Sequence, residues 1–148
     1  MKHIIDVNMD LACSMASISH GKRLQVGAVL VTANDVVLRG VNGLPKPLGN
    51  ELEYEVEDSV SLVTKPTVIH AELNCLLKAA REGVSVVGST LFVTHSPCPH
   101  CASMLASAGV VKVYYKDVHR NGEGLEVLKQ CGIEAVKLER RLSIEGEE

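Results

Sequence analysis

Two short clusters carry the residue types that could do chemistry in this chain. In the first cluster, one residue separates His70 from Glu72. In the second, Cys98 directly follows Pro97, and Cys101 lies one helical turn after Cys98. Imidazole and thiolate are common zinc ligands, and three protein ligands leave a fourth coordination position for water. Together the clusters predict a catalytic zinc centre with His70, Cys98 and Cys101 as ligands.

Glu72 has the type and position of a proton-transfer residue. It follows His70 by two residues, so its carboxylate could reach a water on the metal without being a ligand itself. Zinc lowers the pKa of such a water towards neutrality, which makes hydroxide available near pH 7. We therefore expect Glu72 to take the proton from the water and pass it to the reacting group.

Each cluster also has a more ordinary interpretation. A Cys-x-x-Cys pair alone is equally typical of a structural zinc site or a redox pair, and a lone His-x-Glu occurs by chance. The rival interpretation of the combined site is a closed structural centre with a fourth ligand from His95, His100 or Cys75. The order of the two clusters, each opening a predicted helix, favours the catalytic centre. The other cysteines and histidines are predicted to be uninvolved, with Cys13 and Cys131 buried as small hydrophobes and His3, His20 and His119 in solvent.

The elements that must position these residues alternate between helix and strand. Apolar periodicity and glycine stops predict helices, and Val- and Leu-rich runs bounded by turn residues predict strands. This alternation predicts an α/β fold, a three-layer α/β/α sandwich around a roughly five-stranded mixed sheet. The expected helices are 4–19, 70–81, 98–108 and 124–130, and the expected strands are 25–32, 36–41, 90–94, 110–115 and 133–138.

One segment breaks the alternation. Residues 43–66 hold prolines, glycines and an acidic run over 51–58, which predicts an ordered-to-flexible insertion. The tail after Glu139 is charged and is expected to fray. Apart from the insertion, residues 1–148 are predicted to form a single domain.

Composition bounds the remaining possibilities. The chain has 148 residues, 46% of them hydrophobic, and a net charge of −3, which disfavours a nucleic-acid partner because phosphate contacts need a basic surface. Its longest strongly apolar stretch, 26–31, is far shorter than a membrane span. Five cysteines, two of them in Cys-x-x-Cys, favour free thiols and metal ligands over a disulfide framework. We expect a cytoplasmic protein with no membrane partner.

Over nearly its full length the chain resembles the cytidine and deoxycytidylate deaminase superfamily, and within it the deoxycytidylate (dCMP) deaminases. The long insertion before His70 is typical of that family, and the sequence around 69–73 is similar to phage-encoded members. Two positions depart from the pattern, since Val41 replaces the usual aromatic residue and His119 stands where a tyrosine is common. The insertion has no Cys or His, so a second, structural zinc is not expected. The segments that carry the resemblance are 25–29 (QVGAV), 39–45 (RGVNGLP), 70–74 (HAELN), 93–98 (VTHSPC) and 132–134 (GIE).

The resemblance implies zinc-dependent hydrolytic deamination of dCMP to dUMP with release of ammonia, in pyrimidine deoxynucleotide metabolism. It assigns a sugar contact to Asn42, for which an Asn-Gly turn is the alternative. It also implies that the Ala71 backbone N–H holds the pyrimidine carbonyl and that the Ser96 carbonyl accepts from the departing amine. A 5′-phosphate needs cationic groups, and Arg23 and Arg120 are the candidates.

The resemblance further implies activation by dCTP with Mg²⁺, inhibition by dTTP, and a homo-oligomer, commonly a hexamer. If the chain is phage-encoded, its location is the host cytoplasm. Two alternatives stay open. One is a sister deaminase acting on tRNA adenosine, guanine or a nucleoside; the other is a non-catalytic zinc-stabilised module that binds nucleotides or partner subunits.

Overall fold

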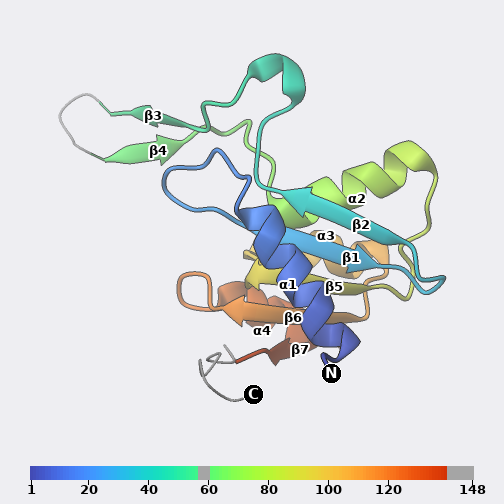
Figure 1. Ribbon diagram of the computed structural model, residues 1–148. Helices are drawn as coiled ribbons and strands as arrows, with labels where there is room; N and C mark the ends of the chain where they lie inside the picture. The colour runs from blue at the N-terminus through green and yellow to red at the C-terminus, as the bar shows by residue number, and fades with distance from the viewer. Residues whose placement is uncertain (57–60, 140–148) are drawn as a thin grey trace.

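A five-stranded sheet forms the centre of the molecule in the computed structural model, which describes residues 1–56 and 61–139 (Figure 1). The strand order is β2-β1-β5-β6-β7. β1 runs antiparallel to β2 and β5, whereas β5, β6 and β7 are parallel to one another. The strands are β1 (Gly27–Val31), β2 (Val37–Val41), β5 (Thr90–His95), β6 (Lys112–Asp117) and β7 (Glu134–Lys137), and the helices are α1 (Ile4–Ala16), α2 (Ala71–Glu82), α3 (Pro99–Ala108) and α4 (Glu123–Gln130).

Helices cover both faces of the sheet (Figure 1). α1 packs on one face through Met9 and Ala12, against Val29, Phe92 and Tyr114. The other three helices cover the opposite face, where alternate residues of the same strands point. The predicted three-layer α/β/α sandwich with a mixed five-stranded sheet is therefore confirmed. The second face buries Ala28, Leu30, Leu91, Val93 and Val113 of the strands with Cys75, Ala102, Leu105 and Leu128 of the helices.

α2 and α3 begin where their sequences allow. His70 is the N-cap of α2 and Cys98 the N-cap of α3, both with extended backbone. Pro99 occupies the first turn of α3, where its missing N–H costs no hydrogen bond. Gly83 and Gly109 end the two helices in the left-handed conformation that glycine adopts readily. Both helix starts lie one residue later than the sequence predicted, and Pro99 rather than Pro97 opens α3.

The insertion contains more regular structure than the sequence predicted. A 3-10 turn, η1 (Lys46–Leu48), precedes a two-stranded hairpin of β3 (Glu53–Glu55) and β4 (Leu62–Thr64). The hairpin projects from the body of the molecule (Figure 1). Residues 57–60 of the acidic run, and the charged tail after Glu139, lie outside the described residues.

The other predicted elements are present with shifted ends. The first helix ends at Ala16 rather than residue 19, and β6 extends two residues further than expected, to Asp117. The single-domain prediction stays a prediction. No helix in residues 1–56 or 61–139 is long and apolar enough to cross a membrane.

Candidate active site

The N-termini of α2 and α3 bring the three predicted metal ligands together. His70 Nδ1 lies 3.3 Å from Cys101 Sγ and 3.6 Å from Cys98 Sγ, and the three ligand atoms all lie within 4.8 Å of one another. No further His, Cys, Asp or Glu of the described ranges joins this group.

The three side chains fit a zinc ion. With zinc–nitrogen and zinc–sulfur bonds of about 2.0 and 2.3 Å, tetrahedral geometry places a nitrogen and a sulfur ligand about 3.5 Å apart. The two nitrogen–sulfur distances, 3.3 and 3.6 Å, lie close to this value. Three ligands of these types, with a fourth position open, are the donor set of a catalytic zinc.

The proton distribution among the ligands also suits a metal. The hydrogen bond from Cys101, together with that from His70, lowers the pKa of the Cys98 thiol to about 3. The same hydrogen bond, with burial, raises the pKa of Cys101 far above its usual range. The hydrogen bond between His70 and Cys98 raises the pKa of the His70 imidazole. Cys98 is thus the ligand thiol that deprotonates most readily, and metal binding would displace the protons that the three ligands share.

Glu72 is a buried carboxyl group beside the ligands. Only 4% of the residue is exposed, and its side chain contacts the Cys101 thiol. Burial raises the pKa of this carboxyl above its usual value. A raised pKa lets this carboxyl group hold a proton more readily than a solvent-exposed glutamate does.

A cavity of about 520 Å³ opens over this cluster. Its volume lies within the range of small-molecule sites. His70, Cys98 and the buried Glu72 line it, and so do the exposed residues Arg23 and Arg120. The apolar side chains that complete its wall are Leu24, Val26, Leu52, Val63 and Val68.

Asn42 organises the loop that forms one side of the cavity. Its Oδ1 accepts hydrogen bonds from Val26 N at 2.9 Å and from the Ser19 hydroxyl at 2.6 Å. Its Nδ2 donates to the Leu24 carbonyl at 2.9 Å. The side chain therefore holds loop 19–26 in place, and one Nδ2 hydrogen remains for the cavity.

Ser96 ties two loops of the site together. Its Oγ accepts from His119 N at 2.7 Å, and its N–H donates to the Asp117 carbonyl at 2.8 Å. These bonds fix the start of the segment that follows β6, which carries His119 and Arg120.

The structure gathers the residues singled out in the sequence. All of the predicted site residues except Cys101 line this cavity, and Cys101 is buried within the ligand group. Sequence reasoning did not assign Glu53, Thr64 or His119 to the site and named His95 only as an alternative fourth zinc ligand, yet all four line the cavity. The signal for a lining role of His95 was its place at the carboxyl end of a strand, where α/β proteins commonly bind ligands.

Two predictions of burial were wrong, and a third holds only in part, since Cys13 is half-buried against the core. His119 is half-buried and lines the cavity instead of facing solvent, because Ser96 holds its backbone inward. Cys131 is exposed, at the C-cap of α4. Of the alternative fourth ligands, Cys75 is buried against the carbonyls of Ala28 and Leu38, and His100 is exposed.

The comparison with known families agrees with this geometry. The model of the cytidine and deoxycytidylate deaminase zinc-binding region matches residues 4–117. The chain belongs to the cytidine and deoxycytidylate deaminase family. The match includes all three candidate zinc ligands and Glu72.

Phage members of the family are among the similar proteins. The deoxycytidylate deaminase of Enterobacteria phage T4 is 43% identical over 75 residues, which cover 49% of this chain and 39% of that protein. The matched segment thus spans well under two thirds of the T4 relative. The deoxycytidylate deaminase of Mycobacterium phage D29 is 33% identical over 117 residues, covering 72% of this chain and 89% of that protein.

A solved family member shares the whole architecture. The dCMP deaminase of cyanophage S-TIM5, crystallised in complex with dCMP and dUMP, superposes with a TM-score of 0.83 at 43% identity. The superposition covers 93% of this chain and 99% of that one.

Proposed function

We propose that this protein hydrolyses dCMP to dUMP and ammonia. The observation that carries the proposal is the cavity, which joins a zinc-type ligand set and a buried carboxyl group to two exposed arginines. Cytosine, sugar and phosphate would need these groups in one pocket. The similarity to a phage enzyme solved with dCMP and dUMP supports the choice of substrate.

His70, Cys98 and Cys101 would hold the zinc ion. A zinc ion with these ligands supplies a Lewis acid that lowers the pKa of water towards neutrality. The N-terminus of α3 adds to this site, because its free N–H groups and helix dipole stabilise the thiolates. Cys101 N donates to Cys98 Sγ at 3.5 Å.

Glu72 is the proposed proton carrier. Its carboxylate would take one proton from the attacking water and deliver it to N3 of cytosine, then take the second proton from the new C4 hydroxyl as the carbonyl forms and deliver it to the departing amine. Water adds at C4, the C4–N4 bond breaks, and the nitrogen leaves as ammonia. Burial against the ligand group keeps the carboxyl group out of bulk solvent.

The remaining contacts orient the nucleotide. The Ala71 N–H is one of the first amides of α2, which intrahelical bonding leaves free for the pyrimidine carbonyl. The Ser96 carbonyl would accept from the amine, and the remaining Nδ2 hydrogen of Asn42 would donate to a sugar hydroxyl. Arg23 and Arg120 would bind the 5′-phosphate.

The substitution Glu72→Gln tests the proton-carrier role. The amide cannot accept and return a proton, so we expect ammonia release from dCMP to fall by at least about 10³-fold. Zinc content, measured by metal analysis, should stay at the wild-type level. Glu82→Gln, at the exposed end of the same helix, is the matched control and should keep full activity.

The same experiment separates the alternatives. Undiminished turnover by the Glu72→Gln variant would contradict the mechanism. A wild-type protein that binds zinc but releases no ammonia from dCMP would favour a sister deaminase for tRNA adenosine, guanine or a nucleoside, or the non-catalytic module.

Regulation and assembly rest on the family resemblance. The Asn42-Gly43 loop with its insertion is where we expect a regulatory dCTP with Mg²⁺, or dTTP, to bind. Unchanged dCMP kinetics on addition of dCTP would remove this expectation. A homo-oligomer, such as a hexamer, and a cytoplasmic location stay predictions; sedimentation would test the assembly.

A further inference from the structure

We propose that Glu53 is a positioning residue that holds Arg23 ready to bind the substrate's 5′-phosphate. Glu53 lies on the β3–β4 hairpin and Arg23 on the loop before β1, 30 residues earlier. The inference rests on the proposed function, which assigns the phosphate contact to Arg23.

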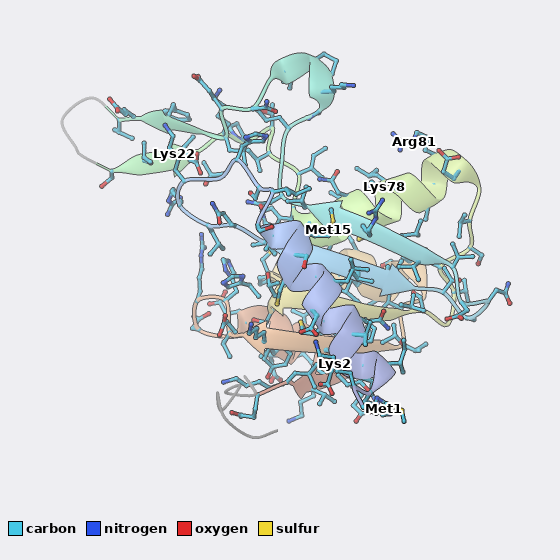
Figure 2. The ribbon with its side chains drawn as sticks, in the orientation of Figure 1. Met1, Lys2, Met15, Lys22, Lys78 and Arg81 are labelled. Atoms are coloured by element: carbon cyan, nitrogen blue, oxygen red, sulfur yellow. The ribbon has the colours of Figure 1, made fainter. Side chains whose placement is uncertain are left out.

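The carboxylate of Glu53 binds the backbone of the loop. Its Oε1 accepts hydrogen bonds from Lys22 N at 2.7 Å and from Arg23 N at 3.1 Å. Hydrogen bonds to an ionised acceptor are stronger than neutral ones. No helix or strand includes residues 22 and 23. These two hydrogen bonds therefore hold a segment that has no regular backbone hydrogen bonding of its own. Figure 2 shows Lys22 beside the hairpin.

The strand opposite Glu53 binds the Arg23 side chain. Arg23 Nη1 donates to Thr64 Oγ1 at 3.3 Å, and Thr64 is the direct cross-strand partner of Glu53. One residue pair of the hairpin therefore holds both the main chain and the guanidinium of Arg23. All three residues line the substrate cavity.

The positive charge of Arg23 is left available. Among the described residues, the ion pairs within 4.0 Å are Lys2–Asp10, Arg81–Glu82 and Lys112–Glu134. Glu53 lies close to Arg23 but uses its carboxylate on backbone N–H groups. The guanidinium is thus held by a neutral hydroxyl, an arrangement that leaves it free to bind an anion.

The expected size of the effect follows from side-chain ordering. An arginine that must be immobilised on binding weakens affinity by about three- to tenfold relative to one already held. Loss of Glu53 should therefore weaken the binding of phosphate-bearing ligands by about this factor. Ligands without a phosphate should bind as before.

The test is calorimetric titration of the zinc-loaded protein with dUMP and with deoxyuridine. We expect Glu53→Ala to weaken dUMP binding about three- to tenfold and to leave deoxyuridine binding unchanged. Glu53→Gln keeps an acceptor oxygen and should restore most of the affinity. Glu55→Ala, two residues along the same strand, is the control and should behave as wild type. Adding Glu53→Ala to Arg23→Ala should cost no further affinity.

Three results would overturn the proposal. They are unchanged dUMP affinity in Glu53→Ala, an equal loss for dUMP and deoxyuridine, and a wild-type protein that binds dUMP no better than deoxyuridine. The equal loss would show a general structural role.

Turnover separates this proposal from the proposed function. If wild-type protein deaminates dCMP, Glu53→Ala should raise KM with kcat unchanged. An unchanged KM there would refute the positioning role alone. If wild-type protein releases no ammonia but dUMP binding still responds to Glu53→Ala, the proposed function fails and the positioning role stands.

Discussion

His70 and Cys98 each occupy the residue immediately before a helix. At that position the backbone is still extended, so the side chain points across the helix end towards the neighbouring helix. Cys101 follows in the first turn of α3 and faces the same point. Metal ligands of this kind are held by helix starts and not by a flexible loop.

The thiols of this chain should differ sharply in reactivity. Burial raises the pKa of Cys75 to about 12, so at pH 8 only about one Cys75 in 10⁴ is a thiolate. Cys131 is exposed. Iodoacetamide labelling of the native zinc-loaded protein, read by peptide mass spectrometry, should modify Cys131 and spare Cys75 until the pH approaches 12. Equal labelling of both at pH 8 would contradict the buried position of Cys75.

Residue type and short-range spacing were enough to single out His70, Cys98, Cys101 and Glu72, which the structure brings together. Their geometry is local, since each lies within two residues of a helix start. The contact between Glu53 and Arg23 was not predictable in this way, because it joins residues 30 positions apart through a hairpin. The exposure of Cys131 was missed because the prediction used only the general tendency of cysteine to be buried. Cys131 lies at the C-terminal end of α4, where it is exposed.

Glycine allows two helices to approach the site closely. A Cβ at Gly40 of β2 would lie 2.2 Å from the Ala71 carbonyl oxygen, at the start of α2. A Cβ at Gly124 of α4 would lie 1.7 Å from the Pro97 carbonyl oxygen. Both glycines thus set the positions of segments that carry zinc ligands.

Gly124→Ala should disturb the zinc site from outside it. The added methyl group must displace Pro97 and Cys98, which we expect to destabilise the fold by about 1–3 kcal/mol and to weaken zinc binding by about 10- to 100-fold. Thermal unfolding and competition with a zinc chelator measure the two effects. Gly43→Ala is the control, since nothing lies within 4 Å of its Cβ position. Wild-type zinc affinity in Gly124→Ala would show that α4 does not position Cys98.

Side chains of α2 also reach the edge strand β2. Asn74 donates to the Val41 carbonyl at 2.7 Å, and Lys78 donates to the Arg39 carbonyl (Figure 2). These side chains occupy carbonyl groups that an edge strand would otherwise offer to another chain. They also fasten α2, with His70 at its start, to β2.

Sequence predicted the long elements better than the short ones. The apolar runs of β1, β5 and β6 and the apolar face of α2 produce clear periodicity. β3 and β4 have three residues each, too few for a pattern, and they stand among prolines, glycines and acidic residues that resemble a loop. Their pairing arises from tertiary contacts such as that of Glu53 with loop 19–26.

The candidate site is built from segments that lie far apart in the sequence. Loop 19–26, the hairpin, the starts of α2 and α3, and the segment after β6 all contribute to one cavity. The alternation of helix and strand predicted the three layers, because each helix buries an apolar face on a common sheet. The alternation could not predict that the β3–β4 hairpin lines the cavity, because the hairpin projects from the three layers (Figure 1).

The proposed substrate can be tested directly. Ammonia release by the zinc-loaded wild-type protein should be compared for dCMP, CMP, dCTP and deoxycytidine. A cavity lined by zinc-type ligands, a buried carboxyl group and two exposed arginines predicts rapid turnover of dCMP and much slower turnover of deoxycytidine, which lacks the phosphate. Ammonia from deoxycytidine as fast as from dCMP, or from none of the four compounds, would contradict dCMP deamination as the function of this protein.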